Sequence, residues 1–279
     1  MHYGINIFPT AYSVRMTELG PDAEERGFES LWVAEHSHIP ASRKTPFPGG
    51  GDLPQMYYDT YDPFVALTAA AAVTKTIKLA TGICLVIQRD PIHTAKQVAS
   101  LDQVSDGRFL FGIGAGWNIE EMNDHGTPGE GRFKLMRERI EAMKEMWTKE
   151  QAEYHGDRVD LPPMFMNPKP VQKPYPPIHV GGGFPGGARR AIRYCDGWIP
   201  IGGRGELADD IAEFRKMAEE EGRHDLEVSV YGVLGKEDLV KGHLDSGVDR
   251  VVFHLQPDSR EDLLPYLDRL AEIKERVGS

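Results

Sequence analysis

The chain alternates between strand-like runs and amphipathic segments from its beginning to its end. Apolar runs with the length and period of β-strands occur at residues 3–8, 30–34, 78–85, 109–113, 178–181, 198–201, 227–232 and 250–255. Segments with helical spacing follow them at residues 17–26, 63–74, 91–105, 132–148, 187–194, 205–221, 236–245 and 260–276. Eight such units favour a closed (β/α)8 TIM barrel of the α/β class over an open, doubly wound sheet, which usually has fewer strands.

Residues typical of helix ends lie at the junctions of these units. Glycine follows four predicted helices, at Gly27, Gly107, Gly197 and Gly247. Glycine accepts the left-handed conformation that ends many helices, and Asp62 and Asp90 each precede a proline, as at a capped helix start. Because 279 residues is an ordinary length for one α/β barrel, we expect a single domain over residues 1–279.

Three connections between these units are longer than usual. They cover about residues 35–62, 114–131 and 149–177. Long ordered connections in compact domains are commonly functional, and the first two follow predicted strand ends. The third is rich in proline, which predicts an extended, ordered insertion and not a flexible linker.

The charge and cysteine content exclude several classes of protein. Lys and Arg number 32 against 43 Asp and Glu, a net charge of −11 with no basic patch, so we expect no nucleic-acid partner. Only Cys84 and Cys195 are present and neither has metal-site spacing, which predicts a reducing, cytoplasmic location. The N-terminus does not resemble a signal peptide, and Lys75 and Lys78 interrupt the most apolar stretch, so we expect no membrane span.

Ionisable side chains follow the second predicted strand, where barrel enzymes carry their chemistry. They are Glu35, His36 and His38. An imidazole exchanges protons near neutral pH, which suits the loss of an alcohol proton as a hydride leaves. His36 therefore fits either proton transfer or a structural role, and Glu35 fits either the site or a buried ion pair. We do not expect this cluster to hold a metal ion.

Two glycine runs also follow predicted strands. In the first, residues 112–117 (GIGAGW), Trp117 stands where a dinucleotide-binding fingerprint has its third glycine. We therefore interpret Ala115 and Gly116 as a strand-end turn that lets a cofactor approach. The second run, Gly181 to Gly183, leads into a helix that carries Arg189 and Arg190. Its exposed N–H groups suit a phosphate, and the glycines fit equally well a loop that needs them only for its backbone geometry.

Taken together, these motifs resemble the luciferase-like monooxygenase superfamily, and especially its members that use the deazaflavin coenzyme F420. The resemblance covers nearly the whole chain. It rests on residues 27–36 (GFESLWVAEH), 80–83 (ATGI), 96–108 (KQVASLDQVSDGR), 112–117 (GIGAGW), 177–182 (PIHVGG) and 191–198 (AIRYCDGW). It implies a bacterial luciferase-like barrel with insertions, a flavin-type ring at its mouth, and a homodimer.

The resemblance also assigns residues to the site. It implies a bulge with a non-proline cis peptide bond behind the cofactor ring, at Gly82-Ile83. It implies an acid and histidine pair at Glu35 and His36, with His36 as the proton-transfer residue, and a phosphate loop at residues 181–183. Two positions depart from the family pattern. Trp117 replaces a glutamate found in relatives that oxidise a sugar phosphate, and Glu35 replaces the more common aspartate.

The resemblance leaves three functions open. The leading one is an F420-dependent oxidoreductase that transfers a hydride between C5 of the cofactor and a small organic substrate. The first alternative is an FMN-dependent two-component monooxygenase that uses reduced flavin and oxygen, and the second is a noncatalytic flavin-binding barrel. A separate reductase or dehydrogenase that supplies reduced cofactor is an expected partner of either enzyme.

Overall fold

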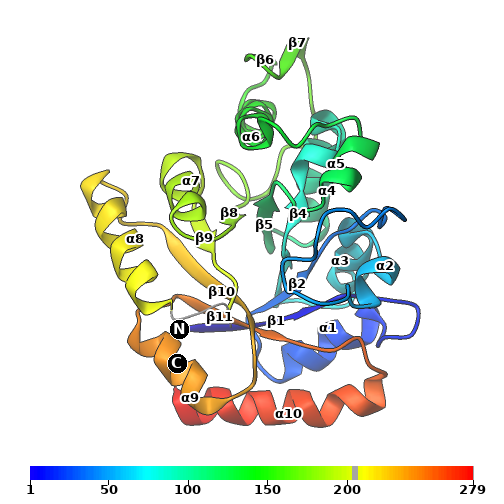
Figure 1. The fold of residues 1–279 in the computed structure, drawn as a ribbon, viewed down its shortest axis with the longest axis vertical. Helices are drawn as coiled ribbons and strands as arrows, with labels where there is room; N and C mark the ends of the chain where they lie inside the picture. Colours follow the sequence, from blue (N-terminus) through cyan, green and yellow to red (C-terminus); the bar gives the residue numbers. More distant parts are fainter. Residues whose placement is uncertain (203–206, 279) are drawn as a thin grey trace.

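The predicted strands form a closed barrel of parallel strands in the computed structural model, which describes residues 1–202 and 207–278 (Figure 1). The strands are β1 (His2–Ile7), β2 (Ser30–Val33), β3 (Lys78–Thr81), β4 (Cys84–Leu85), β5 (Phe109–Gly114), β8 (Ile178–Gly181), β9 (Gly197–Ile199), β10 (Glu227–Val233) and β11 (Arg250–His254). They follow the order β3, β2, β1, β11, β10, β9, β8, β5, β4, and pairing of β3 with β5 closes the ring. The predicted (β/α)8 barrel is confirmed.

The third predicted strand, residues 78–85, is interrupted. β3 ends at Thr81, β4 begins at Cys84, and both pieces pair with β5. Between them the peptide bond that joins Gly82 and Ile83 is cis, at the position that the family resemblance predicts. A Cβ atom on Gly82 would lie 2.4 Å from Cε2 of Tyr231, so the ring on β10 excludes a side chain at this point.

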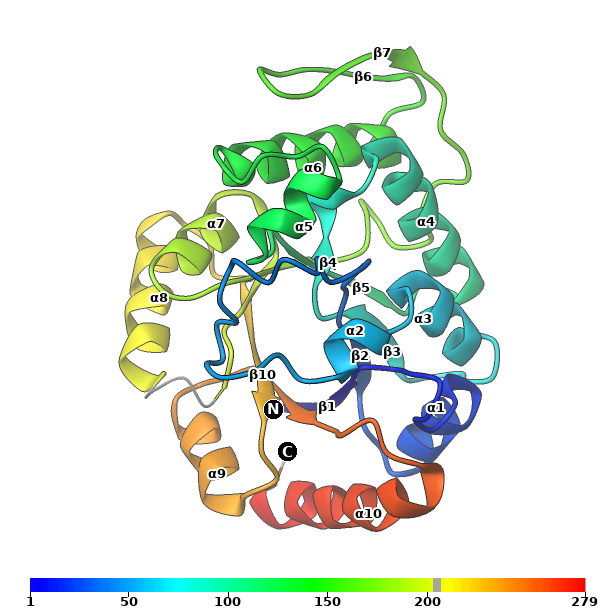
Figure 2. The ribbon, with the colours of Figure 1, turned by 45° about the vertical axis from the view of Figure 1, so that its right-hand side comes forward.

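The helices lie around the outside of the barrel (Figures 1 and 2). They are α1 (Met16–Glu25), α2 (Met56–Asp59), α3 (Pro63–Ala71), α4 (Pro91–Val104), α5 (Ile119–Asp124), α6 (Arg132–Thr148), α7 (Gly186–Tyr194), α8 (Ala208–Glu220), α9 (Glu237–Asp245) and α10 (Arg260–Val277), with a 3₁₀ turn at Val86–Gln88. Part of the helix predicted over residues 205–221 falls at 205 and 206, outside the described residues. From Ala208 the helix is present.

The helix ends agree with the sequence except at one glycine. The carboxylates of Asp62 and Asp90 accept backbone N–H groups in the first turns of α3 and α4. Gly27, Gly107 and Gly247 have φ angles of 67°, 77° and 72°. Gly197, in contrast, is the first residue of β9, and a Cβ there would lie 2.8 Å from the carbonyl oxygen of Glu227. Close strand packing, and not a helix cap, requires this glycine.

The three long connections differ in structure. Residues 35–62 contain only the short α2, and residues 114–131 contain α5 (Figure 2). The proline-rich third connection contains an antiparallel hairpin of β6 (Ala152–His155) and β7 (Asp160–Met164), which projects from the top of the barrel in Figure 1. The sequence did not predict these two strands. β7 pairs only with β6, which leaves it an edge strand, where proline is tolerated.

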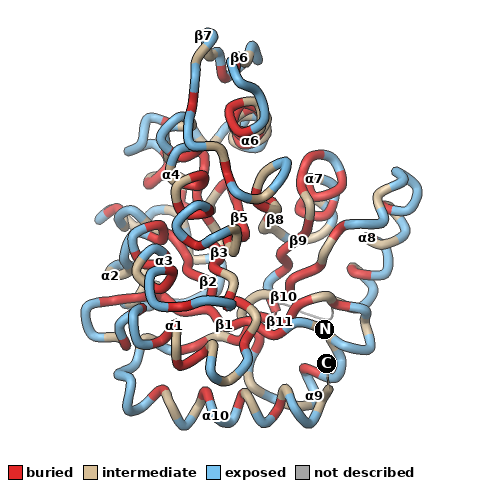
Figure 3. Tube along the Cα trace, turned by 180° about the vertical axis from the view of Figure 1, so that it is seen from behind, coloured by how far each residue is buried: buried red, intermediate tan, exposed pale blue. Residues whose placement is uncertain are grey.

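Two layers of apolar side chains form the core. Inside the barrel, five strands contribute one small cluster of buried side chains, Trp32, Ala80, Leu110, Ile199 and Val252. The larger cluster lies between the strands and the helices, where Figure 3 shows the buried stretches of the chain. It includes the helical stripe Met136, Ile140, Met143 and Trp147, as core packing predicts. Within the described residues, no helix combines the length and hydropathy that a membrane crossing requires.

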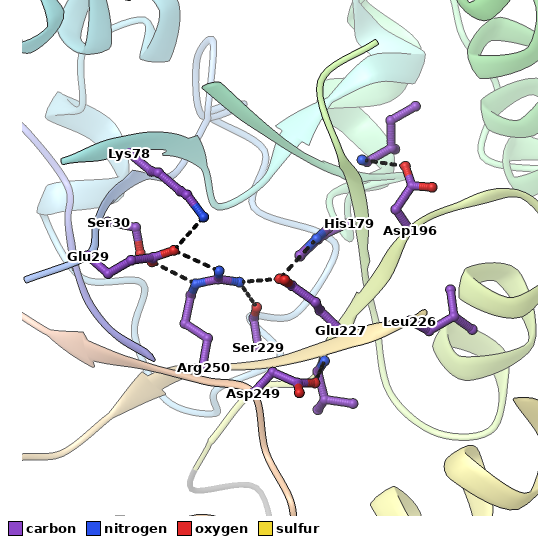
Figure 4. Close-up of polar contacts among 12 residues, drawn as sticks. Glu29, Ser30, Lys78, His179, Asp196, Leu226, Glu227, Ser229, Asp249 and Arg250 are labelled. Carbon is purple, nitrogen blue, oxygen red and sulfur yellow. Dashed lines mark hydrogen bonds and ion pairs between the residues drawn. The ribbon is translucent and has the colours of Figure 1, made fainter. Parts of the chain in front are cut away.

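A buried arginine ties the strands together at the end of the barrel where they begin (Figure 4). Arg250 donates to both oxygens of Glu29, at 2.9 Å each, and to Glu227 at 2.8 Å and Ser229 at 2.9 Å. Lys78 lies 2.9 Å from Glu29. The Arg250 side chain is fully buried. One cation thus joins the starts of β2, β10 and β11.

The network shifts the titration of its neighbours. Burial raises the pKa of Glu29, but hydrogen bonds from Arg250 and its charge outweigh burial and lower that pKa to about 2. Burial, followed by the charge of Arg250, lowers the pKa of His179 to about 4. His179 is therefore neutral at pH 7, with Nε2 at 3.6 Å from Glu227.

We expect Arg250→Met to lower the free energy of unfolding by about 3–5 kcal/mol, because it leaves Glu29 and Glu227 without their cation. The control is Arg276→Met, because Arg276 forms ion pairs with Glu237 and Glu272 at the surface. The control should cost less than about 1 kcal/mol. Urea unfolding measures both changes, and equal losses would show that the buried network does not support the barrel.

We also expect an acid-dependent loss of stability at His179. Since its pKa is lower in the folded state than the ordinary value of 6.5, the unfolded chain binds the proton first. The stabilisation is complete above pH 6.5 and falls by about 3 kcal/mol as the pH drops towards 4. Urea unfolding across this window should show a smaller decline for His179→Gln. The decline should be unchanged for His2→Gln, which alters an exposed side chain.

Candidate active site

A cavity of about 530 Å³ opens at the ends of the strands opposite the Arg250 network. Every residue that the sequence assigned to the site lines it: Glu35, His36, Gly82, Ile83, Ala115, Gly116, Gly181, Gly182 and Gly183. They come from four different strand ends, because parallel strands in a barrel place their carboxyl ends at one face. The structure thus brings the predicted residues together at one face of the barrel.

His36 is held by a glutamate that the sequence did not indicate. Nδ1 of His36 lies 2.9 Å from Oε2 of Glu121, and the backbone N–H of Ser37 donates to Oε1 at 3.2 Å. The Glu121 side chain is 1% exposed and that of His36 is 6% exposed. With Nδ1 on the carboxylate, Nε2 is the ring nitrogen that can meet a ligand in the cavity.

Glu35 and His36, the predicted acid and histidine pair, both line the cavity but have different partners. The carboxylate of Glu35 accepts the N–H of Leu85 at 2.6 Å and forms an ion pair with Arg89, which also contacts Asp62. The alternative interpretation of Glu35, a buried ion pair, is the one that the structure shows.

Glu121 lies 85 residues after His36 in the sequence, on α5 within the second long connection. Asn118 caps this short helix, whose first turn holds Glu120 and Glu121. A pair of glutamates in a first turn is typical of a solvated helix start. The length of the connection predicted a functional role, but the sequence pattern did not separate the buried Glu121 from its half-buried neighbour Glu120.

Ile83 forms the floor of the cavity. A Cβ atom on Gly114 would lie 1.8 Å from Cδ1 of Ile83, and one on Gly181 would lie 3.1 Å from Cγ2. The isoleucine side chain therefore occupies the space left by two glycines on neighbouring strands. The cavity floor is apolar and follows directly from the break between β3 and β4.

A tyrosine that the sequence did not single out lines the cavity beside this floor. The hydroxyl of Tyr231 is buried and has no hydrogen-bond partner among residues 1–202 and 207–278. Burial raises the pKa of this phenol, so it is protonated at neutral pH. Tyr231 can therefore donate a hydrogen bond to a ligand.

The glycine loop after β8 carries a cation at its edge. The guanidinium of Arg190, on α7, packs on this loop, and a Cβ on Gly182 would lie 2.9 Å from its Nη2. It also lies 4.1 Å from the ring centre of Phe133. Nε of Arg190 is buried and has no hydrogen-bond partner in the described part of the chain. Arg189 is exposed, so Arg190 is the member of the predicted cationic pair that lines the cavity.

Known proteins resemble this chain in sequence or in fold. A family model described as luciferase-like monooxygenase matches residues 9–234. An uncharacterised protein of Mycobacterium tuberculosis is 37% identical over 276 residues, which cover 97% of this chain and 98% of that protein. An F420-dependent glucose-6-phosphate dehydrogenase of Kineococcus radiotolerans is 28% identical over 68% of this chain and 53% of that protein. The crystal structure of monooxygenase RslO1 from Streptomyces bottropensis superposes with a TM-score of 0.80, at 21% identity over 99% of both chains.

The chain belongs to the luciferase-like monooxygenase family. One sequence relative is an F420-dependent dehydrogenase, and one protein of the same fold is a monooxygenase. The family therefore supports an oxidoreductase with a flavin or deazaflavin cofactor. The sequence expectation of a luciferase-like barrel is confirmed.

The Glu121 contact predicts the tautomer of His36. When the imidazole is neutral, its hydrogen should lie on Nδ1, with the Nδ1–H form at least about tenfold more populated than the Nε2–H form. Nitrogen-15 histidine NMR at alkaline pH measures this ratio, and His36→Ala assigns the signal. Glu121→Gln should retain the preference through its carbonyl oxygen, and Glu121→Leu should lose it. An Nε2–H form in the unaltered protein would contradict the assignment.

Proposed function

We propose that this protein is an F420-dependent oxidoreductase that transfers a hydride between C5 of the deazaflavin and a small organic substrate. The observation that carries the proposal is the convergence of an imidazole, an apolar floor and a glycine loop edged by a guanidinium in one cavity. The sequence relation to an F420-dependent dehydrogenase supports the deazaflavin.

The residues of the cavity fit such a cofactor. The apolar surface of Ile83 suits a flat ring, and the unpartnered hydroxyl of Tyr231 suits a polar atom on its edge. The N–H groups of residues 181–183 and the guanidinium of Arg190 suit the phosphate of the cofactor tail. When bound, the deazaflavin would accept or donate a hydride, which carries two electrons.

The chain itself supplies the path of the proton. Nε2 of His36 takes the hydroxyl proton of an alcohol substrate when its C–H bond is oxidised, or returns that proton when a carbonyl is reduced. Glu121 holds the ring through Nδ1, so that Nε2 is directed to the cavity. Glu121 acts here as a positioning residue, because its contact is with His36.

The alternative function is an FMN-dependent two-component monooxygenase. The observation that favours it is the superposition with monooxygenase RslO1. The same loop and arginine suit the phosphate of FMN, so the two cofactors differ in the chemistry that they support more than in their contacts. Either enzyme would receive reduced cofactor from a separate reductase or dehydrogenase. We also propose that the protein forms a homodimer. A noncatalytic flavin-binding barrel would have no need of the His36 and Glu121 pair.

The proposed cofactor contacts predict the effect of Arg190→Gln. A fluorescence titration with F420 should show saturable binding that the substitution weakens about tenfold or more, because a charge-assisted hydrogen bond is lost. Arg189→Gln, which changes the exposed neighbour, should alter the dissociation constant by less than about twofold.

The same titration with FMN separates the alternatives. Tighter binding of reduced FMN, accompanied by oxygen consumption, would replace the deazaflavin proposal with the monooxygenase. If neither cofactor binds, both enzymes are ruled out. If F420 binds and Arg190→Gln has no effect, the cofactor proposal stands, but Arg190 and the glycine loop do not bind its phosphate.

A further inference from the structure

Four aromatic side chains surround His36 at the mouth of the cavity, and we refer to them as the aromatic enclosure. They are Phe8, Phe47, Tyr57 and Trp117. The ring centres of Tyr57 and Trp117 lie 5.4 Å and 5.8 Å from that of His36. Phe47 contacts both of these rings, at 5.2 Å and 5.9 Å, and Phe8 lies 4.6 Å from Tyr57. Aromatic rings thus pack against His36, whose Nδ1 contacts Glu121.

The enclosure is held by contacts between two connections that are distant in sequence. Phe47 and Tyr57 belong to residues 35–62, and Trp117 belongs to residues 114–131. The backbone N–H of Thr45 donates to Glu120 at 3.1 Å, and its hydroxyl accepts the N–H of Ile119 at 3.3 Å. These hydrogen bonds fix one connection on the other. The aromatic rings are therefore part of a built wall and do not depend on a single exposed loop.

The cation that lines the cavity lies beside the glycine loop and not in the aromatic enclosure. Among the lining residues that the structure describes, Arg190 is the one lysine or arginine, and it lies beside the glycine loop that suits the cofactor phosphate. Arg43 lies 5.9 Å from the ring centre of Trp117 but is not a lining residue. The described enclosure therefore offers aromatic surface and one imidazole, and it offers no cation for a substrate phosphate.

We propose that the substrate is a neutral ketone or secondary alcohol that carries an apolar ring, which the aromatic enclosure binds while its oxygen meets Nε2 of His36. This inference rests on the proposed function. In the direction of oxidation, the carbinol C–H bond breaks and its electron pair passes with the hydrogen to C5 of the oxidised deazaflavin. The O–H proton passes to His36, and the C=O bond forms. Reduction reverses both transfers.

Apolar contact sets the expected discrimination among ketones. Each buried methylene group contributes about a fourfold change in affinity, and a phenyl ring buries the area of several. Aromatic pairs add a further preference for ring-bearing ligands. The related F420-dependent dehydrogenase is named for glucose 6-phosphate, a charged sugar phosphate. This compound therefore contrasts directly with a neutral ketone that carries an apolar ring.

Isothermal titration tests the proposal with acetone, acetophenone and glucose 6-phosphate as probes. Each probe is titrated into the protein with F420 bound and into the protein alone, so that the enclosure is tested whether or not the cofactor binds. We expect acetophenone to bind at least about tenfold more tightly than acetone in both forms, and glucose 6-phosphate to bind more weakly than acetophenone. Equal affinity for the two ketones, or preferred binding of the sugar phosphate, would overturn the proposal.

A matched pair of variants locates the binding surface. Phe47→Ala removes one ring of the enclosure, and Phe165→Ala removes a ring that is 70% exposed and does not line the cavity. Phe47→Ala should weaken acetophenone about tenfold and acetone less than twofold, while Phe165→Ala should leave both unchanged. Binding of acetophenone that is insensitive to Phe47→Ala would place the ligand elsewhere and contradict the proposal. F420 affinity, measured in parallel, reports failure of the proposed function separately.

Discussion

The barrel closes along the line where β3 and β4 meet β5, and the site depends on that closure. β3 pairs with β5 at Leu79 and Ala80, and β4 pairs with it farther along, at Cys84 and Leu85. Between the two pairings, β3 and β5 approach so closely that a Cβ on Gly112 would lie 1.9 Å from the carbonyl oxygen of Thr81. The first glycine of the run 112–116 is therefore required by closure of the barrel and not by a ligand.

The same line of contact builds the floor of the cavity. Because the third strand is interrupted at Gly82 and Ile83, the isoleucine side chain turns onto β5 and β8, where Gly114 and Gly181 leave room for it. The ring of Tyr231 fills the space beside Gly82 from β10. One interruption thus places an apolar surface and a phenol together at the mouth of the barrel. Closure of the barrel thus requires Gly112, and the cavity floor requires Gly114 and Gly181 on the neighbouring strands.

The sequence predicted the barrel because its information is periodic and local. Alternating strand and helix patterns identify eight units, and strand ends point to the residues of one face, which is why the predicted site residues meet in one cavity. The sequence did not indicate the carboxylate that contacts His36, because that contact depends on how two connections fold against each other. The side chain of Glu121 is buried while Glu120 binds Thr45, and no pattern in the sequence separates these neighbours. Arg250 was likewise missed, since a buried cation in a strand follows no apolar period.

The two ends of the barrel use buried polar groups differently, and this difference distinguishes a support from a site. At the end where the strands begin, every guanidinium nitrogen of Arg250 donates to an oxygen of the protein. In that network, Nδ1 of His179 is the one side-chain nitrogen without a partner among the described residues. At the end where the strands finish, Nε of Arg190 and the hydroxyl of Tyr231 are buried at the cavity and have no hydrogen-bond partner among the described residues. A buried donor without a partner costs free energy, so two of them around one cavity indicate that a ligand with acceptor groups completes them. The unsatisfied end of the barrel also holds His36, where Glu121 orders the imidazole before any ligand arrives.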